Sequence, residues 1–113
     1  KKPALVVCHT SLLYNWKEEC HKFNTDLKTL VIDGMPNQRK KLIKNLKDYD
    51  VVITSYSLLQ KDIDAYDKIT FSYMILDEAQ HIKNRGTRNA KSVKLVKAEH
   101  RMILSGTPIE NSL

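Results

Sequence analysis

The sequence predicts an α/β fold in which a parallel sheet of about five strands is flanked by helices. Short apolar runs alternate along the chain with segments whose apolar residues recur at helical spacing. Several runs are apolar on both alternating faces, which is typical of parallel strands covered on each side. With 113 residues and 42% hydrophobic content, the chain is expected to form a single domain or part of one.

The first unit is a strand at Ala4–Cys8 followed by a helix. Thr10 or Ser11 is expected to cap the helix, because their hydroxyls can accept from its free N–H groups. Apolar residues then recur at helical spacing and predict one buried stripe, which includes Trp16 as a core residue. The stripe consists of Leu12, Leu13, Trp16, Cys20 and Phe23.

The second unit is a strand at Lys28–Ile32, closed by the turn signal Asp33-Gly34. Pro36 is suited to the first turn of the helix that follows. The buried side of this helix is expected to hold Leu42, Ile43 and Leu46. Its basic side chains are interpreted as a solvated face, and they are Arg39, Lys40, Lys41, Lys44 and Lys47.

The third unit is a strand at Val51–Thr54, from which Ser55, Tyr56 and Ser57 lead into a short helical segment. An acidic, turn-like stretch follows at Asp62–Asp67. The fourth strand begins at Phe71 and is predicted to be buried on both faces. Its apolar residues are Tyr73, Met74, Ile75 and Leu76.

Thr87 is the expected cap of one more helix, whose apolar side holds Ala90, Val93 and Val96. A last strand is expected at Arg101–Leu104. It runs into the turn Ser105-Gly106-Thr107-Pro108.

Two adjacent acids, Asp77 and Glu78, stand where the fourth strand should end. The carboxyl ends of parallel strands form the ligand crevice of open α/β sheets. An aspartate there can hold Mg²⁺, and a neighbouring glutamate can orient or deprotonate water that attacks a phosphate. The hydroxyls of Ser105 and Thr107 could sense which phosphates remain. The alternative is that the acids decorate a helix start and the later segment is only a turn.

The net charge of +6 and the pI of about 9.3 are typical of a nucleic-acid partner, although simple solubility explains them equally well. A zinc site built from Cys8, His9, Cys20 and His21 is disfavoured, because the short Cys-x-x-Cys spacing is missing. We expect reduced cysteines. Neither an apolar run of membrane-spanning length nor a leader pattern occurs in the sequence, so no membrane partner is expected.

Four stretches resemble motifs of the Swi/Snf-type DNA-dependent ATPases of helicase superfamily two, in the order of that family. They are Leu5 to Trp16 (motif Ia), Ile53 to Tyr56 (motif Ib), Asp77 to Asn84 (motif II) and Leu104 to Leu113 (motif III). The resemblance implies a RecA-like, P-loop NTPase-type lobe, and a parent protein that uses ATP and Mg²⁺ to move on duplex DNA. The motifs differ from the usual family pattern in having Gln80 and His9, neither of which removes a group needed for phosphoryl transfer.

The resemblance also implies roles for individual residues. Asp77 would serve Mg²⁺ and Glu78 the attacking water. Coupling between nucleotide and DNA would fall to Gln80, Ser105, Gly106 and Thr107. The DNA-binding side would include Ser11, Asn15, Thr54, Ser55 and Tyr56.

The sequence holds no Gly-rich loop ending in Gly-Lys-Ser or Gly-Lys-Thr. We therefore interpret residues 1–113 as part of a first motor lobe that lacks the phosphate-loop strand, and expect no ATP turnover without that strand and the second motor lobe. A bare sheet edge beside Arg101–Leu104 could then pair with a second copy. The expected location is the cytoplasm and nucleoid of a prokaryote, or the nucleus of a eukaryote.

The main alternative from another class is a nonenzymatic, basic α/β interaction module. A nuclease using Asp77 and Glu78 with Mg²⁺ is less favoured, because further acidic ligands at other strand ends are missing.

Overall fold

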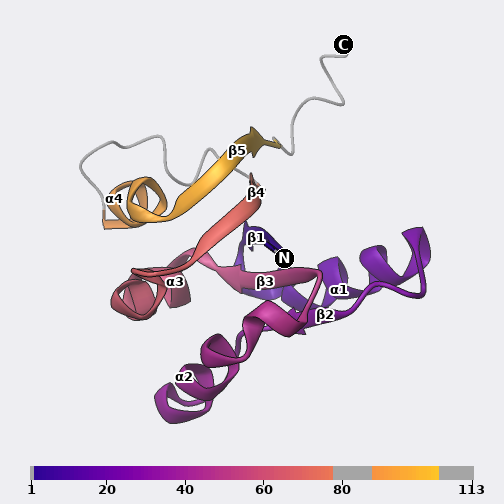
Figure 1. The fold of residues 1–113 in the computed structure, drawn as a ribbon, viewed down its shortest axis with the longest axis horizontal. Helices are drawn as coiled ribbons and strands as arrows, with labels where there is room; N and C mark the ends of the chain where they lie inside the picture. The colour runs from indigo at the N-terminus through magenta and orange to yellow at the C-terminus, as the bar shows by residue number, and fades with distance from the viewer. Residues whose placement is uncertain (1, 78–87, 105–113) are drawn as a thin grey trace.

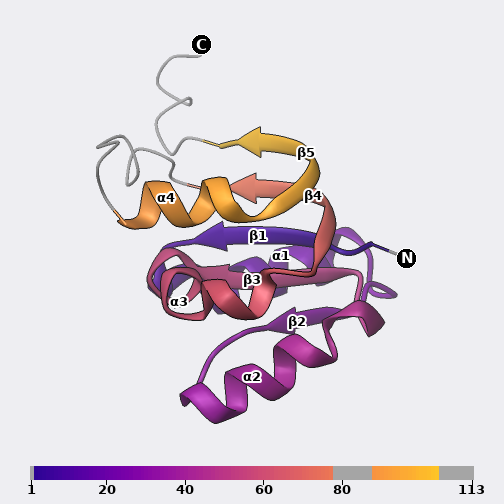
Figure 2. The ribbon, with the colours of Figure 1, turned by 60° about the vertical axis from the view of Figure 1, so that its left-hand side comes forward.

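The computed structural model describes residues 2–77 and 88–104. Within these ranges, five parallel strands form one sheet in the order β2-β3-β1-β4-β5, as Figure 1 and Figure 2 show. The strands are β1 (Ala4–Cys8), β2 (Thr29–Val31), β3 (Val51–Ser55), β4 (Thr70–Leu76) and β5 (Lys97–Ile103). The predicted fold class is confirmed.

The α-helices are α1 (Leu13–Phe23), α2 (Pro36–Lys44), α3 (Tyr56–Asp62) and α4 (Arg88–Leu95). Three 3-10 segments supplement them, at Thr10–Leu12, Leu46–Asp48 and Ile63–Tyr66. Helix α1 lies on one face of the sheet, whereas α2, α3 and α4 lie on the other (Figure 2).

Strand β1 supplies the core on both faces because its side chains alternate. Leu5 and Val7 belong to the larger apolar cluster, under α2, α3 and α4. Val6 and Cys8 belong to the smaller cluster, where Leu13 of α1 packs. These four side chains of the five-residue strand are almost completely buried, as the continuous apolar run predicted.

Two residues predicted to be buried are exposed. Phe23 is the last residue of α1 and is 87% exposed, since the helix packs on the sheet through its first turns. Tyr73 of β4 is 43% exposed, because α1 packs on β2 and β3 and not over that part of β4. Its ring instead stacks on His100 of the neighbouring strand, with the ring centroids 4.9 Å apart.

The predicted starts of two elements also need correction. The side chain of His9, not that of Thr10 or Ser11, caps the turn before α1: its Nδ1 accepts from the Ser11 N–H at 3.2 Å. Strand β5 starts at Lys97, four residues before the predicted start at Arg101, because its pairing with β4 begins at Thr70↔Lys97.

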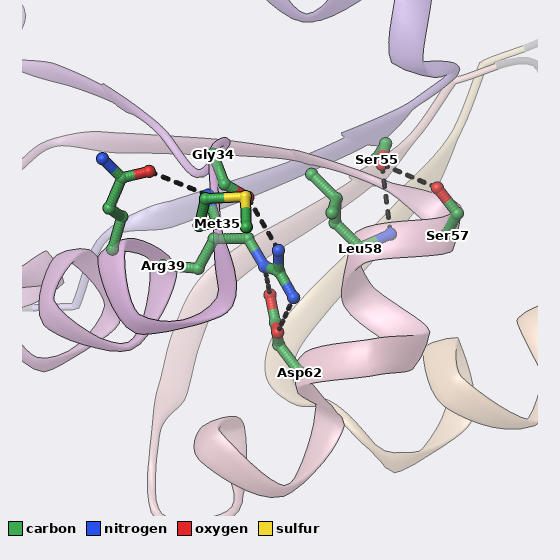
Figure 3. Close-up of polar contacts among 8 residues, drawn as sticks. Gly34, Met35, Arg39, Ser55, Ser57, Leu58 and Asp62 are labelled. Carbon is green, nitrogen blue, oxygen red and sulfur yellow. Dashed lines mark hydrogen bonds and ion pairs between the residues drawn. The ribbon is translucent and has the colours of Figure 1, made fainter.

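Arg39 was predicted to lie on a solvated face, and it is buried. Its Nε and Nη2 donate to Asp62 at 2.8 and 2.9 Å, and its Nη1 donates to the Gly34 carbonyl at 2.8 Å (Figure 3). The ion pair joins α2 to α3 beneath the turn after β2. Gly34 occupies this turn with a φ of +103°, a conformation that favours glycine.

We predict that Asp62→Asn lowers the free energy of unfolding by about 3 kcal/mol, because it leaves the buried guanidinium without its counter-charge. Urea denaturation followed by circular dichroism measures the change. Asp64→Asn is the matched control, since Asp64 is exposed two residues further on. Equal stability of the two variants would contradict a structural role for the ion pair.

Candidate functional site

The parallel strands bring their carboxyl ends to one edge of the sheet. Ser11 follows β1, Asp33 follows β2, Ser57 follows β3 and Asp77 follows β4. Ser11 and Asp77, which the sequence assigned to function, therefore lie at one edge of the sheet. We call this edge the carboxyl edge.

Several hydrogen bonds hold Asp77 at this edge. Its N–H donates to the Val7 carbonyl at 2.9 Å, which continues the pairing of β4 with β1. The Tyr56 hydroxyl donates to the Asp77 carbonyl at 2.6 Å. The Trp16 indole Nε1 donates to Oδ2 of its carboxylate at 2.8 Å. The half-buried carboxylate thus has a defined direction.

Trp16 was assigned to the core from its spacing alone, and the structure corrects that assignment in part. Its ring packs against the smaller apolar cluster, yet the side chain is half-buried and its N–H is directed to Asp77. A pocket of about 240 Å³ adjoins this contact. It is lined by Leu12, Asn15, Trp16, Glu19 and Asp77.

Ser11 and Asn15 are exposed, as a DNA-facing role requires, and Asn15 lines this pocket. The Ser11 hydroxyl lies 2.9 Å from His9 Nδ1, so the turn before α1 is internally bonded. Both predicted residues are therefore accessible from the carboxyl edge.

The motif Ib residues have a different environment. The exposed fractions of Thr54, Ser55 and Tyr56 are 0%, 1% and 5%. Ser55 caps α3, because its Oγ accepts from the Leu58 N–H at 3.2 Å (Figure 3). These three side chains are buried, so a contact of this segment with DNA would have to use its backbone or an exposed neighbour. The DNA-binding role of the segment stays a prediction. Ser57, which sequence reasoning did not single out, is the exposed hydroxyl of this segment.

Glu78, Gln80, Ser105, Gly106 and Thr107 lie outside the described residues, as does the predicted cap Thr87. The approach to Ser105 is described. The Leu104 N–H donates to the Leu76 carbonyl at 2.8 Å, so the chain leaves β5 beside the end of β4.

Cys8 is fully buried below the edge, and its Sγ donates to the Thr54 carbonyl at 3.8 Å. Burial, with a smaller contribution from Asp77, raises the pKa of this thiol to about 12. In residues 2–77 and 88–104 no group of three or more His, Cys, Asp or Glu side chains comes together as a metal site. The thiol of Cys8 is a buried core group.

The chemistry of the edge is suited to Mg²⁺. That ion prefers oxygen ligands, and in nucleotide sites it commonly uses one or two carboxylates together with phosphates and water. Asp77 offers one half-buried carboxylate at a strand end, with one oxygen committed to Trp16. Among the helices that the structure describes, none is long and apolar enough to cross a membrane.

The strand order and the acid at the end of β4 define a RecA-like α/β lobe, the fold of SNF2-type ATPase cores. The SNF2-related domain family matches residues 1–113, and the chain belongs to this family.

Two solved structures are similar to this chain. The Sulfolobus solfataricus SWI2/SNF2 ATPase core in complex with dsDNA has a TM-score of 0.83 and 41% identity, over 97% of this chain and 22% of that chain. The Sulfolobus solfataricus SWI2/SNF2 ATPase core domain has a TM-score of 0.76 and 39% identity, over 98% of this chain and 22% of that chain.

Curated relatives give the same family. The chain is 40% identical over 111 residues to the TATA-binding protein-associated factor mot1 of Schizosaccharomyces pombe, covering 98% of this chain and 6% of that protein. It is 41% identical over 113 residues to TATA-binding protein-associated factor 172 of Homo sapiens, with the same coverage. An ATP-dependent helicase of Mycoplasma pneumoniae is 38% identical over 111 residues, covering 98% of this chain and 11% of that protein. The chain thus spans a small part of each relative.

We predict that iodoacetamide at pH 8 modifies Cys20 well before Cys8. Cys20 is half-buried, whereas Cys8 is inaccessible and its raised pKa leaves almost no thiolate. Mass spectrometry of peptides from the native protein measures both rates. Cys8 should react only after unfolding in urea, and similar native rates for the two thiols would contradict the burial of Cys8.

Proposed function

We propose that the protein containing this chain is a DNA-dependent ATPase that couples ATP hydrolysis to movement on duplex DNA. The observation that carries the proposal is the half-buried Asp77 at the carboxyl edge of an SNF2-family lobe, held there by Trp16 and Tyr56. The likeness to a SWI2/SNF2 core in complex with dsDNA supports the choice of ligand.

In this proposal, Asp77 holds Mg²⁺ and Glu78 orients or deprotonates the attacking water. When bound, Mg²⁺ neutralises negative charge on the phosphate oxygens of ATP. Residues of the segments that follow β4 and β5 couple the nucleotide that is bound to the strength of DNA binding. They are Gln80, Ser105, Gly106 and Thr107.

DNA is proposed to contact the carboxyl edge near Ser11 and Asn15, which are exposed. The segment of Thr54, Ser55 and Tyr56 would contribute through its backbone and through Ser57, because its other side chains are buried. Such contacts go to phosphates and carry no base information. The net charge of +6 favours them.

The rest of the protein is proposed to supply the phosphate-binding loop and a second motor lobe. Strand β5 is at the end of the strand order, and Met102 and Ile103 are 46% and 67% exposed. A further strand is proposed to pair there, and a second copy could pair there in its absence. The proposed location is the compartment that holds the DNA.

We predict that duplex DNA stimulates the ATPase activity of the full-length protein, and that Glu78→Gln lowers kcat by about 10²- to 10⁴-fold, the usual contribution of a general base. Steady-state phosphate release with and without DNA measures both effects. The isolated 113-residue chain is expected to show no turnover.

Asp33→Asn is the matched control, since Asp33 is a half-buried acid at the same edge that follows β2. It should retain the DNA-stimulated rate. An ATPase rate that does not change when duplex DNA is added, or that is the same in Glu78→Gln as in the wild type, would refute the proposed function.

We also predict that Ser11→Glu weakens duplex DNA binding, because it adds a negative charge beside the proposed phosphate contacts. If about three phosphates are contacted, affinity should fall roughly fortyfold between 50 and 200 mM salt. Fluorescence anisotropy with labelled duplexes measures both effects. Thr25→Glu is the control, since Thr25 is exposed in the loop that joins α1 to β2. Equal weakening by the two variants would argue against the carboxyl edge as the DNA side.

A further inference from the structure

Asp77 is held from two separate parts of the chain. Trp16, in the first turns of α1, donates to its carboxylate, and Tyr56, the first residue of α3, donates to its carbonyl. In sequence these donors lie 61 and 21 residues from Asp77. They come from the two segments in which DNA contact was predicted.

The contact with Trp16 restricts the carboxylate itself. An indole has one N–H and accepts no hydrogen bond, so the 2.8 Å bond to Oδ2 uses its whole polar capacity. The bond is short and joins a ring N–H to a carboxyl oxygen. Among the described residues, no side chain other than Trp16 bonds to the Asp77 carboxylate, and the bond to Oδ2 leaves Oδ1 available to a ligand in this part of the structure.

Packing alone does not require this arrangement. Leu13 is the buried residue of α1, at 2% exposure, whereas Trp16 is half-buried on the wall of the 240 Å³ pocket. The exposed residues Asn15 and Glu19 line the same pocket. The indole thus stands between the apolar cluster and the carboxyl edge, with its N–H directed to the acid.

We propose that Trp16 is a positioning residue for Asp77: its N–H fixes one carboxylate oxygen and thereby presents the other to a divalent cation. This inference rests on the proposed function, because it assigns Asp77 to the metal. Outer-shell partners of metal ligands commonly contribute about 10- to 100-fold in metal affinity or activity. The same bond ties α1, which follows the exposed Ser11, to the metal ligand.

The test uses the full-length protein with Trp16→Phe, which removes the N–H, and with 3-benzothienylalanine in place of Trp16, which keeps the bicyclic shape and replaces N–H by sulfur. Mn²⁺ is the probe, in the presence of a nonhydrolysable ATP analogue. Electron paramagnetic resonance of free Mn²⁺ gives its dissociation constant without any turnover. The Mg²⁺ concentration for half-maximal ATPase activity is the second readout.

Tyr14→Phe is the matched control. Tyr14 is an exposed aromatic residue two positions earlier on α1, and its hydroxyl also donates one hydrogen bond to a carboxylate, that of Asp33, at 3.2 Å. The Tyr14→Phe substitution removes one hydrogen-bond donor from an aromatic side chain of α1, as the Trp16 replacements do, but this donor does not bond to Asp77.

Both Trp16 replacements should weaken Mn²⁺ binding on the order of 10-fold and raise the half-saturating Mg²⁺ concentration, with Tyr14→Phe like the wild type. Unchanged Mn²⁺ affinity in both replacements would overturn the inference. So would weakening by Trp16→Phe alone, because the N–H would then not be the cause, or equal weakening by Tyr14→Phe. If DNA fails to stimulate the wild-type ATPase, the proposed function fails, and the Mn²⁺ measurement still decides the role of Trp16.

Discussion

The central position of β1 is the constraint on which the rest of this structure depends. It pairs in parallel with β3 on one side and β4 on the other, and its four almost completely buried side chains reach both apolar clusters. Parallel pairing puts the ends of three strands at one level. The turn of His9 to Ser11, the cap Ser55 and the acid Asp77 are therefore neighbours although they are far apart in sequence.

The strands could be predicted from sequence because each apolar run carries its own signal. Ala4–Cys8 is the clearest case, since a continuous run that is buried on both faces must lie inside a sheet. The start of β5 carried no such signal. Its first four residues, Lys97 to His100, are mostly exposed and polar, and they become strand only through pairing with β4.

The side chains that were misplaced are those whose environment is set by a distant partner. Arg39 looks like its neighbouring lysines until Asp62, 23 residues later, is brought beside it. Trp16 matches a core spacing, and its contact with Asp77 depends on the β1–β4 pairing. The spacing of residues along a helix predicts on which side of the helix a residue lies. It does not predict which atom its polar group will bond to. The acid itself was predictable, because a strand end is a local feature.

Trp16 is the only tryptophan among the 113 residues. All tryptophan fluorescence of this chain therefore comes from one indole, and that indole is hydrogen-bonded to Asp77. A chromophore in direct contact with a carboxyl group is sensitive to any change in the charge around it. The lobe thus carries an intrinsic optical probe at the place where its chemistry is proposed to occur, and needs no added dye.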